Sequence, residues 1–212
     1  AIMNYCENNL IRFYSVPHVR NYIKRQLQLE LLGEVPVLSI RTEPLQNPVN
    51  RLAKRLFDLT FSSLFLLTIF PFIYLFVGLI IKITSPGPIF FKQERNGENG
   101  KIFKCYKFRS MKVNALSDSL QATKNDPRKT KFGNFLRKSN LDELPQFINV
   151  FKGEMSIVGP RPHMLKHTEE YSQLINKYMM RHLVKPGITG WAQVTGYRGE
   201  TKELSQMEGR VR

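Results

Sequence analysis

The chain has 212 residues and carries 32 Lys and Arg residues against 17 Asp and Glu, which gives a formal net charge of +15. This length fits one domain with an appendage, and 42% hydrophobic with 11% aromatic residues excludes a disordered chain. The positive excess predicts an anionic partner, which nucleic acid, acidic lipid or a phosphorylated small molecule would satisfy equally well. Cys6 and Cys105 have no His or Cys neighbours at metal-ligand spacing, which argues against a disulfide framework or a zinc site and fits a reducing compartment.

The N-terminal part of the chain is too short to bury a core of its own. Segment 35–40 is strand-like, and the polar segment 43–48, interrupted by two prolines, is typical of a linker. Segment 21–32 is predicted to be helical and to stop at Gly33, because apolar residues recur at helical spacing at Ile23, Leu27 and Leu31. We therefore divide the chain into residues 1–46 and 47–212.

The most unusual segment is an uncharged run from Leu59 through Ile81, LTFSSLFLLTIFPFIYLFVGLII. About 20 apolar residues of helix cross a membrane core, so this run has membrane length. Pro71 lies in its middle, where it removes a backbone donor and clashes with the carbonyl of Leu67. A kink or break is therefore expected, and the hydroxyls of nearby residues would satisfy the freed carbonyls: Ser62, Ser63 or Thr68.

Basic residues flank the run on both sides, whereas a simple spanning helix usually shows an asymmetry. These residues are Arg51, Lys54 and Arg55 before the run and Lys82, Lys92 and Arg95 after it. The pattern favours a re-entrant segment that enters and leaves by the cytoplasmic face. A kinked spanning anchor and, less favoured at this length, a buried core helix remain alternatives.

The rest of the chain has the pattern of a small hairpin followed by helices. We expect hairpin strands at 89–91 and 102–108, a polar surface loop over 114–131, a packed helix over 144–152 that ends at Gly153, and a second helix over 167–183.

Two adjacent carboxylates, Asp142 and Glu143, precede Pro145, a residue that belongs in a first helical turn. We therefore expect a helix to begin near Asp142, where the helix dipole favours an ionised carboxylate by roughly 0.3–1 kcal/mol. This position suits an anionic nucleophile. It suits an ordinary helix cap as well, and on spacing alone the cap is the commoner explanation.

Basic side chains in stiff turns offer a second signal. Lys107 and Arg109 follow the hairpin, Arg161 lies in a GPRP turn, and the loop 185–193 carries the single Trp191. Arginine forks match phosphate oxygens, and prolines hold a turn rigid. Alternatively, the basic residues are simply solvated and the Trp is a packing plug.

Taken together and in this order, four motifs resemble the bacterial sugar transferase family, the monotopic phosphoglycosyl transferases. They are the apolar run with Pro71, SPGPIFFKQERNGENGKIFKCYKFRSM (85–111), LRKSNLDELPQFINVFKGEMSIVGPRP (136–162) and KPGITGWAQV (185–194). The resemblance covers about residues 50 to 200. It implies an α+β, mainly helical, monotopic membrane fold with a re-entrant broken helix at about 52–84, amphipathic surface helices and a small β-hairpin.

The resemblance implies transfer of a sugar-1-phosphate from a UDP-sugar to undecaprenyl phosphate with release of UMP. The reaction would run through a covalent aspartyl-phosphosugar, as the first membrane step of capsule, exopolysaccharide or O-antigen synthesis. The expected place is the bacterial inner membrane, with the catalytic face cytoplasmic and membrane lipids as partners. Glucose is the favoured sugar, and the resemblance leaves room for a homodimer.

The resemblance also assigns roles to the candidate residues. Asp142 falls on the nucleophile and Glu143 on the second acid, which would support a metal or handle protons. Mg²⁺ is expected on the acidic pair, with Asp142 and the substrate oxygens as its main ligands. The residues expected to bind substrate phosphates are Arg137, Arg161, Arg109 and Lys107.

Two other functions remain open on the sequence. The first is a non-catalytic membrane scaffold for polysaccharide assembly. Only the acidic pair and its arginines argue against it and for an enzyme. A nucleic-acid-binding module would explain the charge but not the uncharged run, so we expect no nucleic-acid partner. Residues 1–46 resemble the end of a nucleotide-binding-like domain of large family members. We therefore expect the chain, which lacks an initiator Met, to be a piece of a longer protein.

Overall fold

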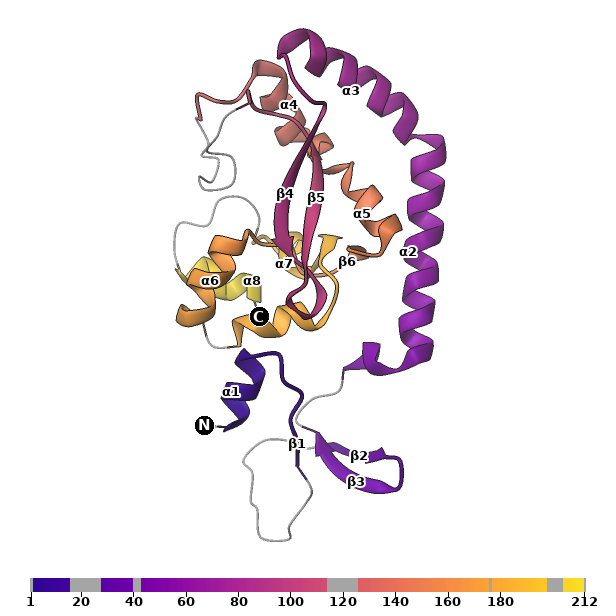
Figure 1. The fold of residues 1–212 in the computed structure, drawn as a ribbon, viewed down its shortest axis with the longest axis vertical. Helices are drawn as coiled ribbons and strands as arrows, with labels where there is room; N and C mark the ends of the chain where they lie inside the picture. The colour runs from indigo at the N-terminus through magenta and orange to yellow at the C-terminus, as the bar shows by residue number, and fades with distance from the viewer. Residues whose placement is uncertain are drawn as a thin grey trace.

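A long bent helical arm lies beside a domain built around a β-hairpin (Figure 1). The computed structural model describes residues 2–15, 28–39, 43–113, 126–175, 177–197 and 204–211. The arm consists of α2 (Pro48–Thr68) and α3 (Phe70–Thr84), and the hairpin consists of β4 (Phe90–Asn96) and β5 (Ile102–Phe108).

The N-terminal segment forms α1 (Ile2–Asn8) and then a small antiparallel sheet with strands in the order β1-β3-β2. Its strands are β1 (Tyr14–Ser15), β2 (Gln28–Leu32) and β3 (Val35–Ser39). The strand prediction at 35–40 is confirmed over 35–39, but the helix prediction is wrong for 28–32. Gly33, at φ 68°, closes a tight turn that pairs Leu32 with Val35, so cross-strand pairing overrides the helical spacing. The remaining residues of that prediction, 21–27, lie outside the described part.

The predicted break in the apolar run is present at Ile69, between α2 and α3, which are bent by 56°. Pro71 lies in the first turn of α3, where its missing donor costs least. The Thr68 hydroxyl donates to the Leu64 carbonyl (2.6 Å), a bond that favours helix bending. Within the described residues, no single helix is long and apolar enough to cross a membrane, but this bent pair passes that test together.

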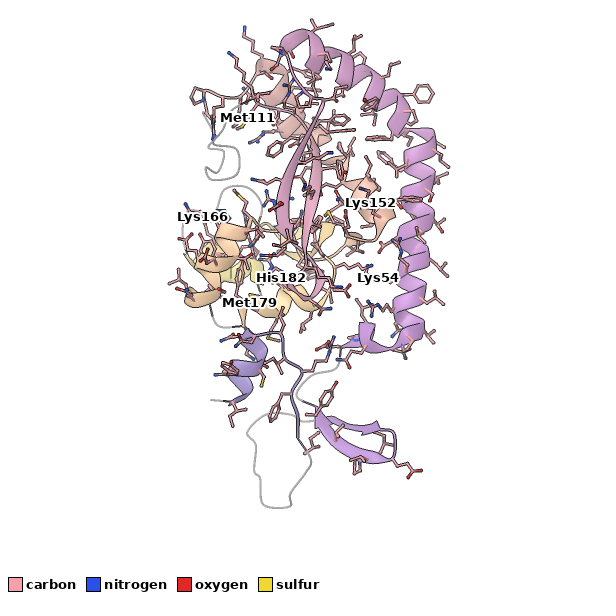
Figure 2. All side chains as sticks on the ribbon, in the orientation of Figure 1. Lys54, Met111, Lys152, Lys166, Met179 and His182 are labelled. Carbon is pink, nitrogen blue, oxygen red and sulfur yellow. The ribbon has the colours of Figure 1, made fainter. Side chains whose placement is uncertain are left out.

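Polar contacts fix α2 to the domain. Asp58 is only 2% exposed, and its Oδ1 accepts hydrogen bonds from Ser156 Oγ and from the backbone N–H of Ile157, both at 3.0 Å. Lys54, on the side of α2 that faces the domain (Figure 2), donates to the Val158 carbonyl (3.1 Å). These bonds cross about a hundred residues of sequence, so α2 has one defined position against the segment that follows α5 (Gln146–Lys152).

Arg55 also faces the domain, where it donates to the Val150 and Phe151 carbonyls at the end of α5, both at 2.8 Å.

The side of the arm away from the domain is apolar and exposed. The large apolar side chains that are exposed along the arm include Leu52, Leu56, Phe61, Leu64, Leu67, Phe72, Leu75, Phe76, Leu79 and Ile83. A face of this size and apolarity on a water-soluble surface would be unusual.

The predicted hairpin is confirmed, with Phe90 paired with Phe108 and Asn96 with Ile102. The second strand has the expected bounds, whereas the first, expected over 89–91, extends from Phe90 to Asn96. Its Phe108 end packs into a core with α3 and α4 (Lys131–Ser139); the buried members of this core are Val77, Ile81, Phe108 and Leu136. A second core joins the hairpin to α5 and the strand after it; its buried members are Phe103, Cys105, Val150 and Met155. The hairpin is thus the element on which the arm and the C-terminal half both pack.

Short elements make up the C-terminal half. In chain order they are η3 (Leu141–Glu143), α5, β6 (Ser156–Val158), α6 (Leu165–Leu174), η4 (Tyr178–Leu183), β7 (Gly187–Thr189), α7 (Trp191–Val194) and α8 (Leu204–Val211). The turns η1 (Pro44–Gln46) and η2 (Glu98–Gly100) lie before α2 and at the hairpin tip.

The two helix predictions in this half have different outcomes. The helix expected over 144–152 is confirmed as α5, which ends at Gly153 with φ 86°. The single helix expected over 167–183 is wrong, because the backbone is extended at Ile175 and left-handed at Lys177. This break lets Tyr178 turn inward, where it is fully buried.

We expect Asp58→Ala to destabilise the protein by about 1–3 kcal/mol, because it leaves the buried Ser156 hydroxyl and the partly buried Ile157 N–H without their acceptor. The free energy of unfolding in detergent or nanodiscs checks this. Thr60→Ala, at an exposed position on the same helix, is the control. Equal stabilities for the two variants would contradict the anchoring role of Asp58.

Candidate functional site

The acidic pair lies in a separate 3-10 turn, η3, and not at the start of an α-helix. Asn140 adopts a left-handed conformation (φ 58°) after α4, and α5 begins only at Gln146 with Pro145 as its cap. The expected helix start at Asp142 is therefore wrong. Pro145 has helical backbone angles, but it is the N-cap of a helix that begins at Gln146. The helix dipole consequently cannot be the main influence on Asp142.

Glu143 is held by two cations from distant elements. Lys107 Nζ, from β5, lies 2.7 Å from Oε1, and the Arg161 guanidinium donates to both oxygens at 2.5 and 3.0 Å. Burial alone would raise the pKa of Glu143, but Lys107 and Arg161 outweigh it and hold that pKa well below its usual range. Glu143 is thus ionised at neutral pH, where it anchors these two cations.

Asp142 is the opposite case. Its side chain is buried, at 6% exposed, and among the described residues no donor forms a hydrogen bond to its carboxylate. Burial raises its pKa, and the negative charge of Glu143 adds to this, while Lys107, Arg137 and Arg161 act against it. The two neighbouring carboxylates therefore have pKa values shifted in opposite directions, a pattern typical of sites in which paired acids have different roles.

Arg137 is held near Asp142 by its own helix. Its Nε donates to Ser110 Oγ at 2.8 Å, across 27 positions of sequence. Gly133, one turn earlier on α4, allows the helix backbone to touch Ser110, since a Cβ there would lie 1.8 Å from the Ser110 carbonyl oxygen. Only glycine fits this contact, which fixes the distance between α4 and the end of the hairpin.

Backbone contact between two motifs positions Arg161. The GPRP turn follows β6 and the KPGITG segment contains β7, and the two strands pair in parallel. Gly159 and Gly187 allow the close approach, because a Cβ at Gly187 would lie 2.1 Å from the Gly159 nitrogen. Trp191 follows directly and is 80% exposed, so the packing-plug interpretation of this residue is wrong.

Arg109 is not brought to the acidic pair. Its guanidinium donates to the carbonyls of Ser85 (2.5 Å) and Pro86 (2.7 Å), at the end of α3. Gly87 leaves room for it, since a Cβ there would overlap its Nη1. The described contacts thus give Arg109 a structural role in the SPGP turn.

One residue that holds the site together was missed by the sequence analysis. Asn149 is fully buried on α5, and its Oδ1 accepts from the Tyr106 N–H (2.9 Å). Its Nδ2 donates to the Lys104 carbonyl (2.8 Å) and to Glu154 Oε2 (2.6 Å). Asn149 therefore ties α5 to β5 beside Lys107. The available signal was an amide with two apolar residues on each side, Phe147-Ile148 and Val150-Phe151.

The donor set partly fits a magnesium ion. Among the described residues no group of three His, Cys, Asp or Glu side chains could hold a metal by itself. Mg²⁺ usually takes one or two carboxylates together with substrate phosphates, which the buried Asp142 carboxylate suits. Glu143 suits it less well, because Lys107 and Arg161 occupy its two oxygens.

The site is thus a buried carboxylate that accepts no hydrogen bond from the described residues, beside cations of which a second carboxylate holds Lys107 and Arg161, on a domain with an apolar bent arm. The family model described as bacterial sugar transferase matches residues 49–212. The chain belongs to this family, which confirms the resemblance found in the sequence.

Several curated relatives are similar over most of the chain. The UDP-glucose:undecaprenyl-phosphate glucose-1-phosphate transferase of Escherichia coli (strain K12) is 53% identical over 197 residues, 92% of this chain and 42% of the relative. The protein of the same name from Xanthomonas campestris pv. campestris is 48% identical over 92% of this chain and 41% of its own length. The exopolysaccharide production protein PSS of Rhizobium leguminosarum bv. phaseoli is 47% identical over 74% of this chain and 81% of its own length. The chain thus spans about two fifths of the length of the first two relatives.

Removing the two charges should change stability in opposite directions. Asp142→Asn should keep or raise the melting temperature at neutral pH, because ionising a buried acid whose pKa is raised costs the folded state free energy. Glu143→Gln should lower stability by about 1.5–3 kcal/mol, the range for hydrogen bonds to charged groups. Thermal and denaturant unfolding check both signs.

The pH dependence of this difference serves as the control. Because the pKa of Glu143 is depressed, its contribution is complete above the unfolded value of about 4.3 and is lost only as pH falls toward the folded value. The Glu143→Gln deficit should therefore stay constant across neutral pH. Destabilisation of similar size by both substitutions would contradict the division of roles.

Proposed function

We propose that the chain carries the catalytic part of a phosphoglycosyl transferase, which moves a sugar-1-phosphate from a UDP-sugar to undecaprenyl phosphate and releases UMP. The observation that carries the proposal is the buried Asp142 carboxylate, without a hydrogen-bond donor among the described residues, beside the fixed cations Lys107, Arg137 and Arg161. The names of relatives support it, as several are glucose-1-phosphate transferases that act on undecaprenyl phosphate. We favour glucose as the sugar, because the more similar relatives are named for it. A 36% identical relative from Aeromonas hydrophila is named for N-acetylgalactosamine, so the test uses several UDP-sugars.

The proposed chemistry has two displacements at one phosphorus atom. In the first, an Asp142 oxygen attacks the phosphorus that bears the sugar, and the bond to the bridging oxygen breaks, so that UMP leaves with the electron pair. In the second, a phosphate oxygen of undecaprenyl phosphate attacks the same phosphorus, and the bond to Asp142 breaks and restores the carboxylate. The products are undecaprenyl diphosphate sugar and UMP.

In this scheme Glu143 organises cations and does not transfer protons. A useful general acid or base has a pKa near the working pH, whereas the pKa of Glu143 is held well below its usual range by Lys107 and Arg161. Glu143 keeps these two cations in place for the diphosphate. Of the two roles that the resemblance left open for Glu143, proton handling is therefore the less favoured.

Mg²⁺ remains part of the proposal, with Asp142 as its protein ligand and phosphate oxygens completing its shell. When bound, it would neutralise charge on the diphosphate, which an anionic nucleophile otherwise could not approach. Lys107, Arg137 and Arg161 would contribute to the same neutralisation from fixed positions.

We further propose that α2 and α3 form the re-entrant membrane segment, with Lys54 and Arg55 on the domain side. The exposed apolar outer face and the 56° bend support this, as does the length of the uncharged run. Location at the bacterial inner membrane, with the site on the cytoplasmic side, follows from the same proposal. The division at residue 46 and a homodimer stay predictions.

Activity should depend on Asp142 and not on an exposed acid outside the site. With Mg²⁺, undecaprenyl phosphate and a panel of UDP-sugars, we expect Asp142→Asn to reduce UMP release by about 10³-fold or more, as for other covalent nucleophiles. Glu170→Gln, an exposed acid on α6, should leave the rate unchanged. If the longest form of the protein releases no UMP with any donor, the non-catalytic scaffold becomes the better explanation.

The rate should rise with pH as Asp142 loses its proton. Because burial and Glu143 raise the pKa of Asp142, the acid limb at low Mg²⁺ should lie above the ordinary aspartate value of about 3.9, and binding of Mg²⁺ to Asp142 should move it to lower pH. Glu143→Gln removes a neighbouring negative charge and frees two cations, so the limb of its residual activity should move to lower pH. Initial rates measured at fixed Mg²⁺ across this range check the direction. A limb that moves upward would contradict the assignment to Asp142.

A further inference from the structure

A cationic pocket of about 160 Å³ adjoins the Asp142 site. Residues from β4, β5, the GPRP turn, α6 and α8 line it, and they include four cations and two imidazoles: Arg95, Lys107, Arg161, Arg210, His163 and His167. Lys107 and Arg161 also contact Glu143, so the pocket and the acidic pair share one wall. No carboxylate is among the lining residues of the part that the structure describes.

The wall behind this pocket adds further positive charge. Arg181, only 9% exposed, donates to the Arg161 carbonyl (2.5 Å) and contacts the His163 ring nitrogens at 2.8 and 3.1 Å. Its guanidinium also lies 5.3 Å from the centre of the Tyr178 ring. The described partners of this buried cation are thus a carbonyl and neutral rings.

The pKa values of the two histidines are lowered, as expected beside positive charge. Burial lowers the pKa of His163 well below its usual value, and the Arg181 charge lowers it further. Burial and the Arg95 charge lower the pKa of His167 in the same way. Both imidazoles are therefore neutral at physiological pH, when each can donate one hydrogen bond without adding charge.

The pocket is partly open to its surroundings. A phosphate group can therefore enter it while the rest of a larger molecule stays outside.

We propose that this pocket binds the phosphate group of a phosphate monoester. Its cations and neutral imidazoles match a dianion with three terminal oxygens. The inference rests on the proposed function, in which the first displacement releases one monoester, UMP, and the second consumes another, undecaprenyl phosphate. Because the pocket shares Lys107 and Arg161 with the acidic pair, either monoester would lie next to the reacting phosphorus. If both use the pocket, UMP must leave before the acceptor binds.

Equilibrium binding tests the proposal without turnover. UMP, uridine, inorganic phosphate and a short-chain prenyl phosphate are titrated into the Asp142→Asn protein in detergent, with and without pocket substitutions, by calorimetry. We expect Arg210→Gln, on α8, to weaken binding of the phosphate-bearing probes by about 10-fold or more, as for a lost charged hydrogen bond. Arg210→Lys should retain most of the affinity, and uridine should bind weakly to every variant.

Two further variants separate a pocket effect from folding and from overall charge. His167→Gln, on a different element, should weaken the same probes while the melting temperature is retained. Lys166→Gln, next to it in sequence but exposed on α6 and outside the pocket lining (Figure 2), should bind as the unsubstituted protein does. This control removes one positive charge, as Arg210→Gln does.

The probes also distinguish the source of the phosphate. If the pocket substitutions weaken the binding of UMP alone, the pocket holds the leaving nucleotide. If they weaken the binding of prenyl phosphate alone, it holds the acceptor. Weakening of both, with mutual competition, supports one shared site. The proposal would be overturned if folded Arg210→Gln and His167→Gln bound the phosphate-bearing probes with unchanged affinity. It would also be overturned if Lys166→Gln lost as much affinity as Arg210→Gln. Intact binding without UMP release in the wild type would instead defeat the proposed function and leave the pocket standing.

Discussion

The ion pairs that Glu143 makes with Lys107 and Arg161 are the constraint on which the rest of the site depends. They join a 3-10 turn, a hairpin strand and a proline-rich turn at one carboxylate. Charges brought out of water need such pairing, because an unpaired buried ion is costly. With Glu143 fully engaged, the adjacent Asp142 keeps a buried carboxylate whose oxygens are not taken by a donor in the described part of the chain. The same interaction thus provides both the fixed cations and the available anion.

The bent arm uses polar contacts for a related reason. Its outer face is apolar, so in a lipid environment apolar packing alone would not distinguish the domain from the lipid. Asp58, Lys54 and Arg55 bond to backbone and side-chain groups around α5 and β6. These directional bonds give the arm one position, and they connect it to the helix that Asn149 ties to the hairpin.

The strong positive charge of the chain is partly concentrated around one point. Arg137 approaches Asp142 from α4, while Arg161 lies between the acidic pair and the cationic pocket. Arg181 holds the backbone of Arg161 from behind. Such preorganised cations need no rearrangement when negative charge develops. Electrostatic stabilisation of phosphoryl transfer is most effective when the charges are already in place.

Much of the fold was predictable where the signal is local. The uncharged run and its central proline predicted a long broken helix, and the segments 89–91 and 102–108 on either side of the polar stretch 96–100 predicted the hairpin. Local patterns failed at 28–32 and at Asp142, where the helical spacing and the Pro145 signal were sound but neighbouring strands and turns decided otherwise. Helix propensity is a weak preference that tertiary contacts of a few kcal/mol override.

The residues of the site divide in the same way. The sequence by itself determined the family and the candidates Asp142, Glu143, Lys107, Arg137 and Arg161, because long ordered motifs retain chemical identity. Only the tertiary structure decided that Glu143 is paired and Asp142 is not, that Arg109 serves the SPGP turn, and that Asn149 and Arg181 hold the site in place. Charge pairing and burial depend on residues that lie from 18 to 45 positions apart in the chain, and no local pattern specifies which of them meet.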